Sequence, residues 1–104
     1  MRKKIHSYIG FAKRSRNLVT GSNSCEFACM RKPVYLLILA EDLSENTIKK
    51  FTSLANRLEI PCRRYGTKEV LSEMAGEADT GVFAVTDNNL ANAILKEIDE
   101  EVCS

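Results

Sequence analysis

Two adjacent carboxylates stand where a buried strand is expected to end. The apolar run from Tyr35 to Ala40 stops at Glu41 and Asp42, and a helical pattern begins directly behind them. Paired carboxylates can carry out acid–base catalysis. Consecutive side chains of a strand point to opposite faces, so these two could act together only if the backbone turns there. Simpler roles are a helix cap for Asp42, because acids favour the positive end of a helix dipole, and solvation for Glu41.

Other catalytic or cofactor-binding patterns are missing from the sequence. His6 is the only histidine, and nothing resembles a nucleophile paired with a base. The glycines at positions 10, 21, 66, 76 and 81 match no phosphate-binding GxGxxG or GxxxxGK[ST] motif. We therefore expect a protein that is not an enzyme and that carries no cofactor.

Four cysteines also do not form a recognisable metal site. Cys25, Cys29, Cys62 and Cys103 lack the CxxC spacing of zinc sites. Without a secretory signal they are expected to be reduced thiols. Cys25 and Cys29 share one face of an expected helix, where they act as small buried hydrophobes. The alternative for this pair is a metal or redox role.

The length and hydropathy of the chain limit its class. Its 104 residues are enough for one domain, which we expect to span residues 1–104 as a monomer. The sequence has no apolar run near the roughly 20 residues that a membrane span requires. The basic start "MRKKIHSYIGFAKRSR" precedes no continuous apolar segment, so it does not read as a signal peptide. These features predict a cytoplasmic protein without a membrane partner.

Charge is distributed unevenly along the chain. The net charge is +1, but residues 1–32 carry eight Lys and Arg against one acid, while residues 67–104 carry nine acids against two lysines. A basic first part favours attraction to a polyanion, and an acidic second part favours a face turned away from it. The alternative is two solvated faces with no partner.

Alternating strands and helices define the expected fold. The doubly apolar run at 34–40 is typical of a strand buried on both faces, and residues 44–59 have the spacing of an amphipathic helix. We predict a three-layer α/β/α sandwich around a central mixed sheet of about four strands, with residues 34–39 central. Before this strand we expect a helix over 2–14, an extended piece at 17–19 and a turn at 20–24. Ser and Asn residues of that turn can cap a helix that ends before Pro33. After residue 59 we expect strands at 62–65 and 82–85, a loop at 76–81, and helices capped by Thr67 and Asp87.

Three segments together resemble a known family. They are "TGSNSCEFACMRKPVYLLILAEDLS", "IPCRRYGTKEVLSEMAG" and the short apolar strand that follows. This pattern is similar to the kink-turn RNA-binding ribosomal proteins, the group of L-seven-Ae and L-thirty-e. The opening "YIGFAKRSRNLVTG" resembles the family's short bacterial YlxQ-like branch. The resemblance covers about Ile9 to Ile98 and implies a three-layer fold that binds sharply bent RNA at one edge.

The resemblance also implies where RNA would bind. The family segment Gly-Thr-Asn-Glu-x-x-Lys, which contacts sheared G·A pairs and phosphates, falls on residues 21–27. The acidic pair matches Glu41 and Asp42, and a second RNA-facing loop matches residues 77–80. A carboxylate can accept hydrogen bonds from a guanine edge, while basic side chains supply attraction. The implied RNA-binding residues are Gly21, Ser22, Asn23, Ser24, Phe27, Lys32, Glu41, Asp42, Glu77, Ala78, Asp79 and Thr80.

Departures from the family pattern predict a degenerate, weakly binding site. Ser24 replaces the glutamate, and Phe27 replaces the lysine; Phe27 could stack on a base or belong to the core. Glu77 and Asp79 add negative charge that would repel phosphate. The expected function is still non-enzymatic binding of structured RNA by a ribosome-associated protein. The alternatives are a protein-interaction domain of the ribosome or transcription machinery that has lost RNA binding, and an enzyme or small-ligand domain.

Overall fold

The computed structural model describes residues 3–103, with side chains described for residues 3–101. Arg2 of the basic first segment and the Cys103 thiol lie outside the described residues. Five helices and four strands alternate along the described residues. They are α1 (Lys3–Arg14), β1 (Leu18–Thr20), α2 (Ser22–Arg31), β2 (Leu36–Leu39), α3 (Glu45–Leu58), β3 (Cys62–Arg64), α4 (Lys68–Ala75), β4 (Val82–Val85) and α5 (Asn88–Cys103).

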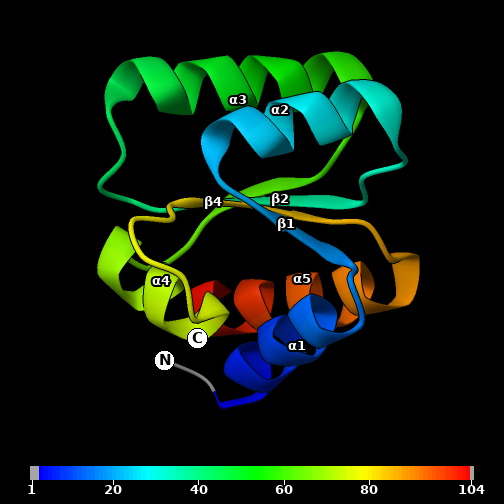
Figure 1. Ribbon diagram of the computed structural model, residues 1–104, viewed down its shortest axis with the longest axis vertical. Helices are drawn as coiled ribbons and strands as arrows, with labels where there is room; N and C mark the ends of the chain where they lie inside the picture. The colour runs from blue at the N-terminus through cyan, green and yellow to red at the C-terminus, as the bar shows by residue number, and fades with distance from the viewer. Residues whose placement is uncertain (1–2, 104) are drawn as a thin grey trace.

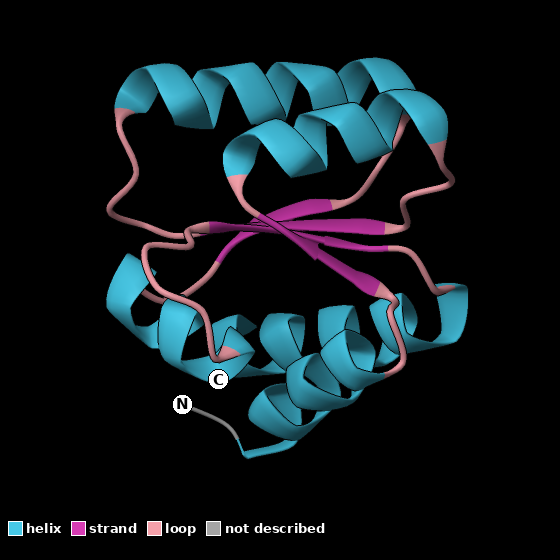
Figure 2. Cartoon of the chain, viewed as in Figure 1, coloured by secondary structure: helices cyan, strands magenta, loops and turns pink. Residues whose placement is uncertain are grey.

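The sheet lies between two helix layers, as the sequence predicts. Helices α2 and α3 cover one face, and α1, α4 and α5 cover the other (Figures 1 and 2). The strand order is β1-β4-β2-β3. β2 pairs with β3 in parallel and with β4 antiparallel, and β1 pairs with β4 antiparallel. The three-layer sandwich with a mixed sheet and a central β2 is therefore confirmed.

β2 explains how the two layers are held to one sheet. All four of its residues are buried, because alternate side chains enter opposite cores. Leu36 and Ile38 pack with α1, α4 and α5 on one face. Leu37 and Leu39 pack with α2 and α3 on the other. Burying each of these leucine and isoleucine side chains contributes roughly 1.5–3 kcal/mol, so β2 anchors both layers.

Three of the helices begin with a side-chain cap. Ser44 accepts a hydrogen bond from Thr47 N at the start of α3, and Thr67 accepts one from Val70 N at the start of α4. Asp87 accepts one from Leu90 N, 2.8 Å away, at the start of α5. The predictions of caps at Thr67 and Asp87 are confirmed.

The start of α2 differs from the sequence prediction. Its N-cap is Gly21, with φ 93° and ψ 149°, so no side chain satisfies the first N–H groups. The expected caps from the turn at 20–24 are wrong, because Ser22, Asn23 and Ser24 already belong to the first helical turn. The positive φ explains why glycine occupies this position.

Two smaller differences come from the ends of elements. The strand predicted at 34–40 is shorter, Leu36–Leu39, although Val34 and Ala40 are buried as well. Leu58 follows the apolar spacing of the helix expected at 44–59 but is 39% exposed. It is the last residue of α3, and Glu59 behind it turns into the left-handed region at φ 58°. None of the helices in residues 3–103 has the length and apolar character to cross a bilayer.

Candidate functional site

Three segments that are distant in sequence meet at one end of the sheet. β1 and β2 both run antiparallel to β4, so their last residues lie beside the first residues of β4. Gly21 N donates to Val82 O at 3.0 Å, and Ala40 N donates to Gly81 O at 2.8 Å. The start of α2, the Glu41–Asp42 turn and the loop 77–80 are therefore brought together by backbone hydrogen bonds.

Glu77 ties the loop 77–80 to the end of β1. The Thr20 hydroxyl donates to Glu77 Oε2, and Lys13 Nζ lies 3.5 Å from the same oxygen. The hydrogen bond from Thr20, helped by the charge of Lys13, holds the pKa of the Glu77 carboxyl below its usual value. Glu77 therefore stays ionised, with a hydroxyl and an ammonium beside its charge.

The rest of the loop 77–80 is held from α4. Asp79 has φ 55°, and its carboxylate lies 3.3 Å from Lys68 Nζ. Thr80 N donates to Ser72 Oγ at 2.8 Å, and that hydroxyl donates to Thr80 O at 3.0 Å. Thr80 is also buried, so of the four predicted loop contacts only Glu77, Ala78 and Asp79 are exposed.

Glu41 and Asp42 have separate roles. Asp42 Oδ1 accepts a hydrogen bond from Lys68 N at 2.8 Å, at the first residue of α4. The expectation that Asp42 caps the helix directly behind it is wrong, since Ser44 caps α3. Glu41 is exposed, and its backbone N–H donates to Gly66 O at 2.8 Å. The two acids therefore do not form an acid–base pair in this structure.

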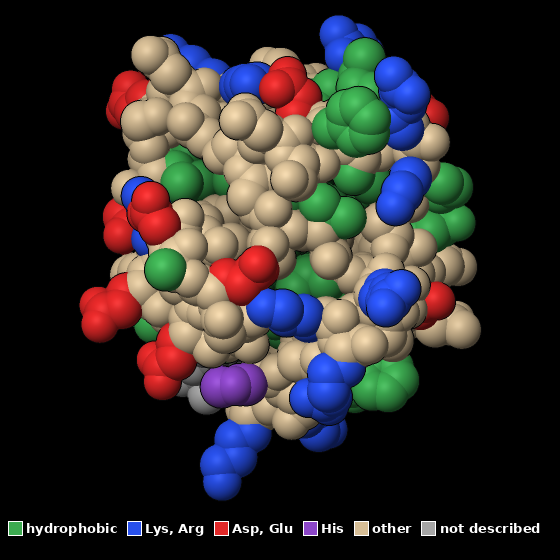
Figure 3. All heavy atoms as spheres, in the orientation of Figure 1, with side chains coloured by type: hydrophobic (Ala, Val, Ile, Leu, Met, Phe, Trp, Pro, Cys, Tyr) green, Lys and Arg blue, Asp and Glu red, His purple; other side chains and the backbone are tan. Residues whose placement is uncertain are grey.

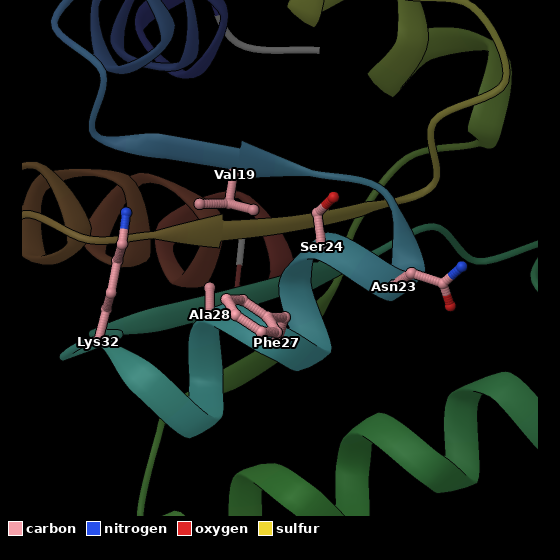
Figure 4. Close-up of a pocket in the computed structure, with 6 residues that line it drawn as sticks. All are labelled: Val19, Asn23, Ser24, Phe27, Ala28 and Lys32. Carbon is pink, nitrogen blue, oxygen red and sulfur yellow. The ribbon is translucent and has the colours of Figure 1, made fainter.

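A shallow hollow of about 360 Å³ lies between α2 and the edge strand β1. Lys32 stands at one end of it and Asn23 at the other, with Phe27 between them (Figure 4). Phe27 is 60% exposed, so the alternative that it belongs to the core is wrong. The guanidinium of Arg31 lies 4.8 Å from the centre of its ring. The residues lining the hollow are Val19, Asn23, Ser24, Phe27, Ala28 and Lys32.

Basic side chains gather beside this hollow. In the space-filling view, Lys and Arg side chains lie mainly on the right, over the C-terminal ends of α1 and α2, and several acidic ones lie on the left near the loop 77–80 (Figure 3). Arg14, Arg16, Arg31 and Lys32 are exposed. The only acid of α2, Glu26, pairs with Lys50 of α3 at 2.9 Å. The β1 edge therefore presents positive charge to solvent.

The described cysteines are free thiols inside or near the α2–α3 core. Cys25 and Cys29 are buried, and Cys62 is partly buried. Burial raises the pKa of all three, that of Cys25 to about 12. Within residues 3–101, no group of three or more Cys, His, Asp or Glu side chains is placed to hold a metal ion. Cys25 and Cys29 belong to the α2–α3 core, and Cys62 packs against it.

Four residues that take part in the candidate site were not predicted from the sequence. Val19 and Ala28 form apolar parts of the hollow, and Thr20 and Lys13 engage the loop 77–80. Of the contacts described here, only that between Phe27 and Arg31 could have been predicted from sequence spacing, because residues four apart lie on the same face of a helix. The other contacts depend on how segments distant in sequence are packed together.

The arrangement of helices and strands places the chain among three-layer α/β/α proteins. With 15% identity, it matches the 15.5 kD RNA-binding protein of Giardia lamblia over 93% of this chain and 83% of that one, with a TM-score of 0.77. It matches the structure of a protein of unknown function from Bacillus halodurans C with 28% identity, a TM-score of 0.89, and coverage of 94% and 99%.

Sequence comparison then identifies the family. The chain belongs to the ribosomal protein L7Ae/L30e/S12e/Gadd45 family, whose model matches residues 3–95. It is 32% identical to the RNA-binding protein YlxQ of Bacillus subtilis (strain 168), over 88% of this chain and 91% of the relative. It is 30% identical to the RNA-binding protein YlxQ of Enterococcus faecium, over 86% of both chains. The resemblance to this family and to its YlxQ-like branch is thereby confirmed.

Proposed function

We propose that this protein binds structured RNA that is sharply bent like a kink-turn, as a cytoplasmic, ribosome-associated monomer. The observation that carries the proposal is the meeting of the α2 start, the Glu41–Asp42 turn and the loop 77–80 at one end of the sheet. These are the segments that the family resemblance assigns to RNA. The names of the YlxQ relatives support the same class of ligand.

The first turn of α2 would bind phosphate or a base edge. Gly21 provides no capping side chain, and Ser22, Asn23 and Ser24 are exposed. Backbone N–H groups at a helix start attract anions, and the Asn23 amide can both donate to and accept from a base. This turn would therefore supply contacts that depend on the local shape of the RNA.

The acids at the other two segments would shape selectivity. Glu41 is exposed and can accept hydrogen bonds from a guanine edge, whereas one oxygen of Asp42 is already occupied by Lys68 N. We therefore assign the RNA-facing role to Glu41 and a mainly structural role to Asp42. Lys13 and Lys68 lie beside the acids of the loop 77–80 and would reduce the repulsion of phosphate there.

Attraction would come from the basic β1 edge. Arg14, Arg16 and Lys32 are exposed, and Lys32 stands at the end of the hollow opposite Asn23 (Figure 4). Positive side chains that neutralise phosphates release bound counterions, so affinity falls with salt. Ser24 and Phe27, which replace a glutamate and a lysine of the family segment, would make kink-turn binding weaker than that of a complete site.

A gel shift tests the proposal. A kink-turn RNA and an unbent duplex of equal length and composition are compared at two salt concentrations. We expect preferential binding of the kink-turn RNA, with affinity for both RNAs falling steeply as salt rises. Equal affinity for the two RNAs would contradict the proposal that the protein recognises a kink-turn. Absence of binding to either would favour a protein-interaction domain.

A further inference from the structure

Phe27 is an exposed aromatic residue at a position where it stabilises little of the fold. It is 60% exposed although it belongs to a ten-residue helix whose Cys25, Ala28 and Cys29 are buried. The guanidinium of Arg31 lies over the Phe27 ring, 4.8 Å from its centre. An exposed aromatic ring with a cation over one face can take a nucleobase on its other face.

The hollow around Phe27 has the chemistry for one nucleotide. Val19, Ala28 and the Phe27 ring give it apolar surface, and Lys32 adds a positive charge at one end (Figure 4). At the other end, Asn23 and Ser24 offer hydrogen-bonding groups. Its volume of about 360 Å³ is at the small end of the roughly 300–1,000 Å³ typical of small-molecule sites, which suits one base and not a duplex.

The charges near the hollow favour an anionic ligand over a neutral group, and the exposed Phe27 ring favours a nucleotide among anions. Arg31 and Lys32 are both exposed, whereas Glu26 is directed to Lys50 of α3. A phosphate could thus contact Lys32 while the attached base lies over the ring. Base–aromatic stacking tolerates any base, because every base has a π-face.

We propose that Phe27 is a stacking platform for a single unpaired RNA base, with Lys32 contacting the phosphate of that nucleotide. The inference rests on the proposed RNA binding and adds its substrate class: RNA that carries an unstacked nucleotide beside the bent region. It also assigns a function to the replacement of the family lysine at this position. The lost phosphate contact is exchanged for a base contact.

The test uses two RNA hairpins, each with a one-nucleotide bulge. In one the bulged nucleotide carries its base, and in the other it is abasic, so the phosphates are identical. Affinities are measured for the wild-type protein, Phe27→Leu, Phe27→Trp and Phe11→Leu. Leucine keeps an apolar side chain but removes the π-face. Phe11 of α1 is 52% exposed and serves as the matched control.

We expect wild type and Phe11→Leu to bind the base-bearing hairpin about tenfold more tightly than the abasic one, the effect of one stacked base. Phe27→Leu should bind both hairpins equally, and Phe27→Trp should keep the preference. Circular dichroism confirms that each variant is folded. A preference that survives in Phe27→Leu overturns the proposal, as does equal binding of both hairpins by wild type.

Failure here can be separated from failure of the proposed function. If the kink-turn RNA is still preferred to its unbent control but base and abasic bulges bind alike, only the platform is wrong. If no RNA binds, both the proposed RNA-binding function and the proposed stacking of a base on Phe27 are wrong.

Discussion

Asp42 Oδ1 accepts a hydrogen bond from the backbone N–H of Lys68, 2.8 Å away. The bond joins the turn after β2 to the first residue of α4, where Thr67 also accepts from Val70 N at 3.2 Å. Two acceptors therefore satisfy orphan N–H groups of one short helix. The acid that follows the buried strand stabilises a helix 26 residues further along the chain.

This bond predicts different effects for the two adjacent acids on stability. Asp42→Ala should lower the free energy of unfolding by about 1 kcal/mol, as loss of a capping acceptor does. Glu41→Ala should change it by less than about 0.5 kcal/mol, because its side chain is exposed. Urea denaturation measures both. Equal losses in the two variants would contradict the assignment.

Asn23 should contribute to RNA selectivity. Asn23→Ala removes an amide from the exposed first turn of α2 and should weaken kink-turn binding by roughly 1–3 kcal/mol if the amide contacts a base. Binding to the unbent control should change much less. Asn46→Ala, an exposed asparagine in the first turn of α3, is a matched control. If both variants bind as wild type does, the α2 start is not the contact surface.

Lys32 should act on all RNAs alike. Lys32→Ala removes an exposed charge and one phosphate contact, so affinity should fall by a similar factor for kink-turn and unbent RNA. The slope of log affinity against log salt should become shallower by about 1. Lys49→Ala, an exposed lysine of α3, provides the comparison. A selective loss of kink-turn binding would show that Lys32 reads structure as well.

Restoring the family residues should strengthen kink-turn binding. Ser24 and Phe27 are both exposed, so Ser24→Glu with Phe27→Lys buries no charge. The double variant should bind kink-turn RNA more tightly than wild type does, and titration by gel shift measures the gain. It should also lose the preference for a base in the bulge. If the double variant still ignores kink-turn RNA and Asn23→Ala is also neutral, the interaction-domain alternative replaces the RNA-binding proposal.

Cys25 should make the fold sensitive to alkali. Burial raises its thiol pKa from the usual 9.0 to about 12, with the neighbouring Cys29 adding to the shift. The unfolded chain therefore loses this proton from about pH 9 upwards while the folded chain keeps it, so stability falls between about pH 9 and pH 12. Near pH 10.5 the loss should reach about 2 kcal/mol.

Comparison with Cys25→Ala isolates that contribution. The unfolding free energy of each protein is measured under reducing conditions at neutral and alkaline pH. The variant should be less stable at neutral pH, because it loses packing and the hydrogen bond from the thiol to Val19 O. Its further decline in alkali should be smaller than that of wild type. Parallel declines would show that the Cys25 thiol does not stay protonated in the folded state.

Local patterns were sufficient to predict the fold. The run at 36–39 is apolar at every position, which indicated a strand covered on both faces, and Thr67 and Asp87 marked helix starts by simple capping chemistry. The start of α2 was mispredicted because three polar residues could each serve as a cap. The N-cap is instead Gly21, which has a positive φ and donates its N–H to Val82 O.

Less of the candidate site than of the fold could be predicted from the sequence. The family resemblance indicated residues 21–27, 41–42 and 77–80, and the structure brings the start of α2 and the other two segments to one end of the sheet. The resemblance could not show that Asp42 accepts a hydrogen bond from α4 or that Thr80 is buried and bonded to Ser72. These contacts join residues between 8 and 26 positions apart, and their geometry depends on how α4 packs against the sheet.

The backbone hydrogen bonds that join the candidate site to the sheet have a consequence for the energetics of recognition. Gly21 is bonded to Val82, the first residue of β4, and Ala40 is bonded to Gly81 just before it, where an added Cβ would lie only 2.8 Å from Leu43 Cδ2. A surface this firmly held loses little conformational entropy when it is occupied. The free-energy cost of adapting shape then falls on the RNA. Selection among RNAs would follow how readily each one bends, and conditions that bend an RNA in advance would tighten its binding without any change in the protein.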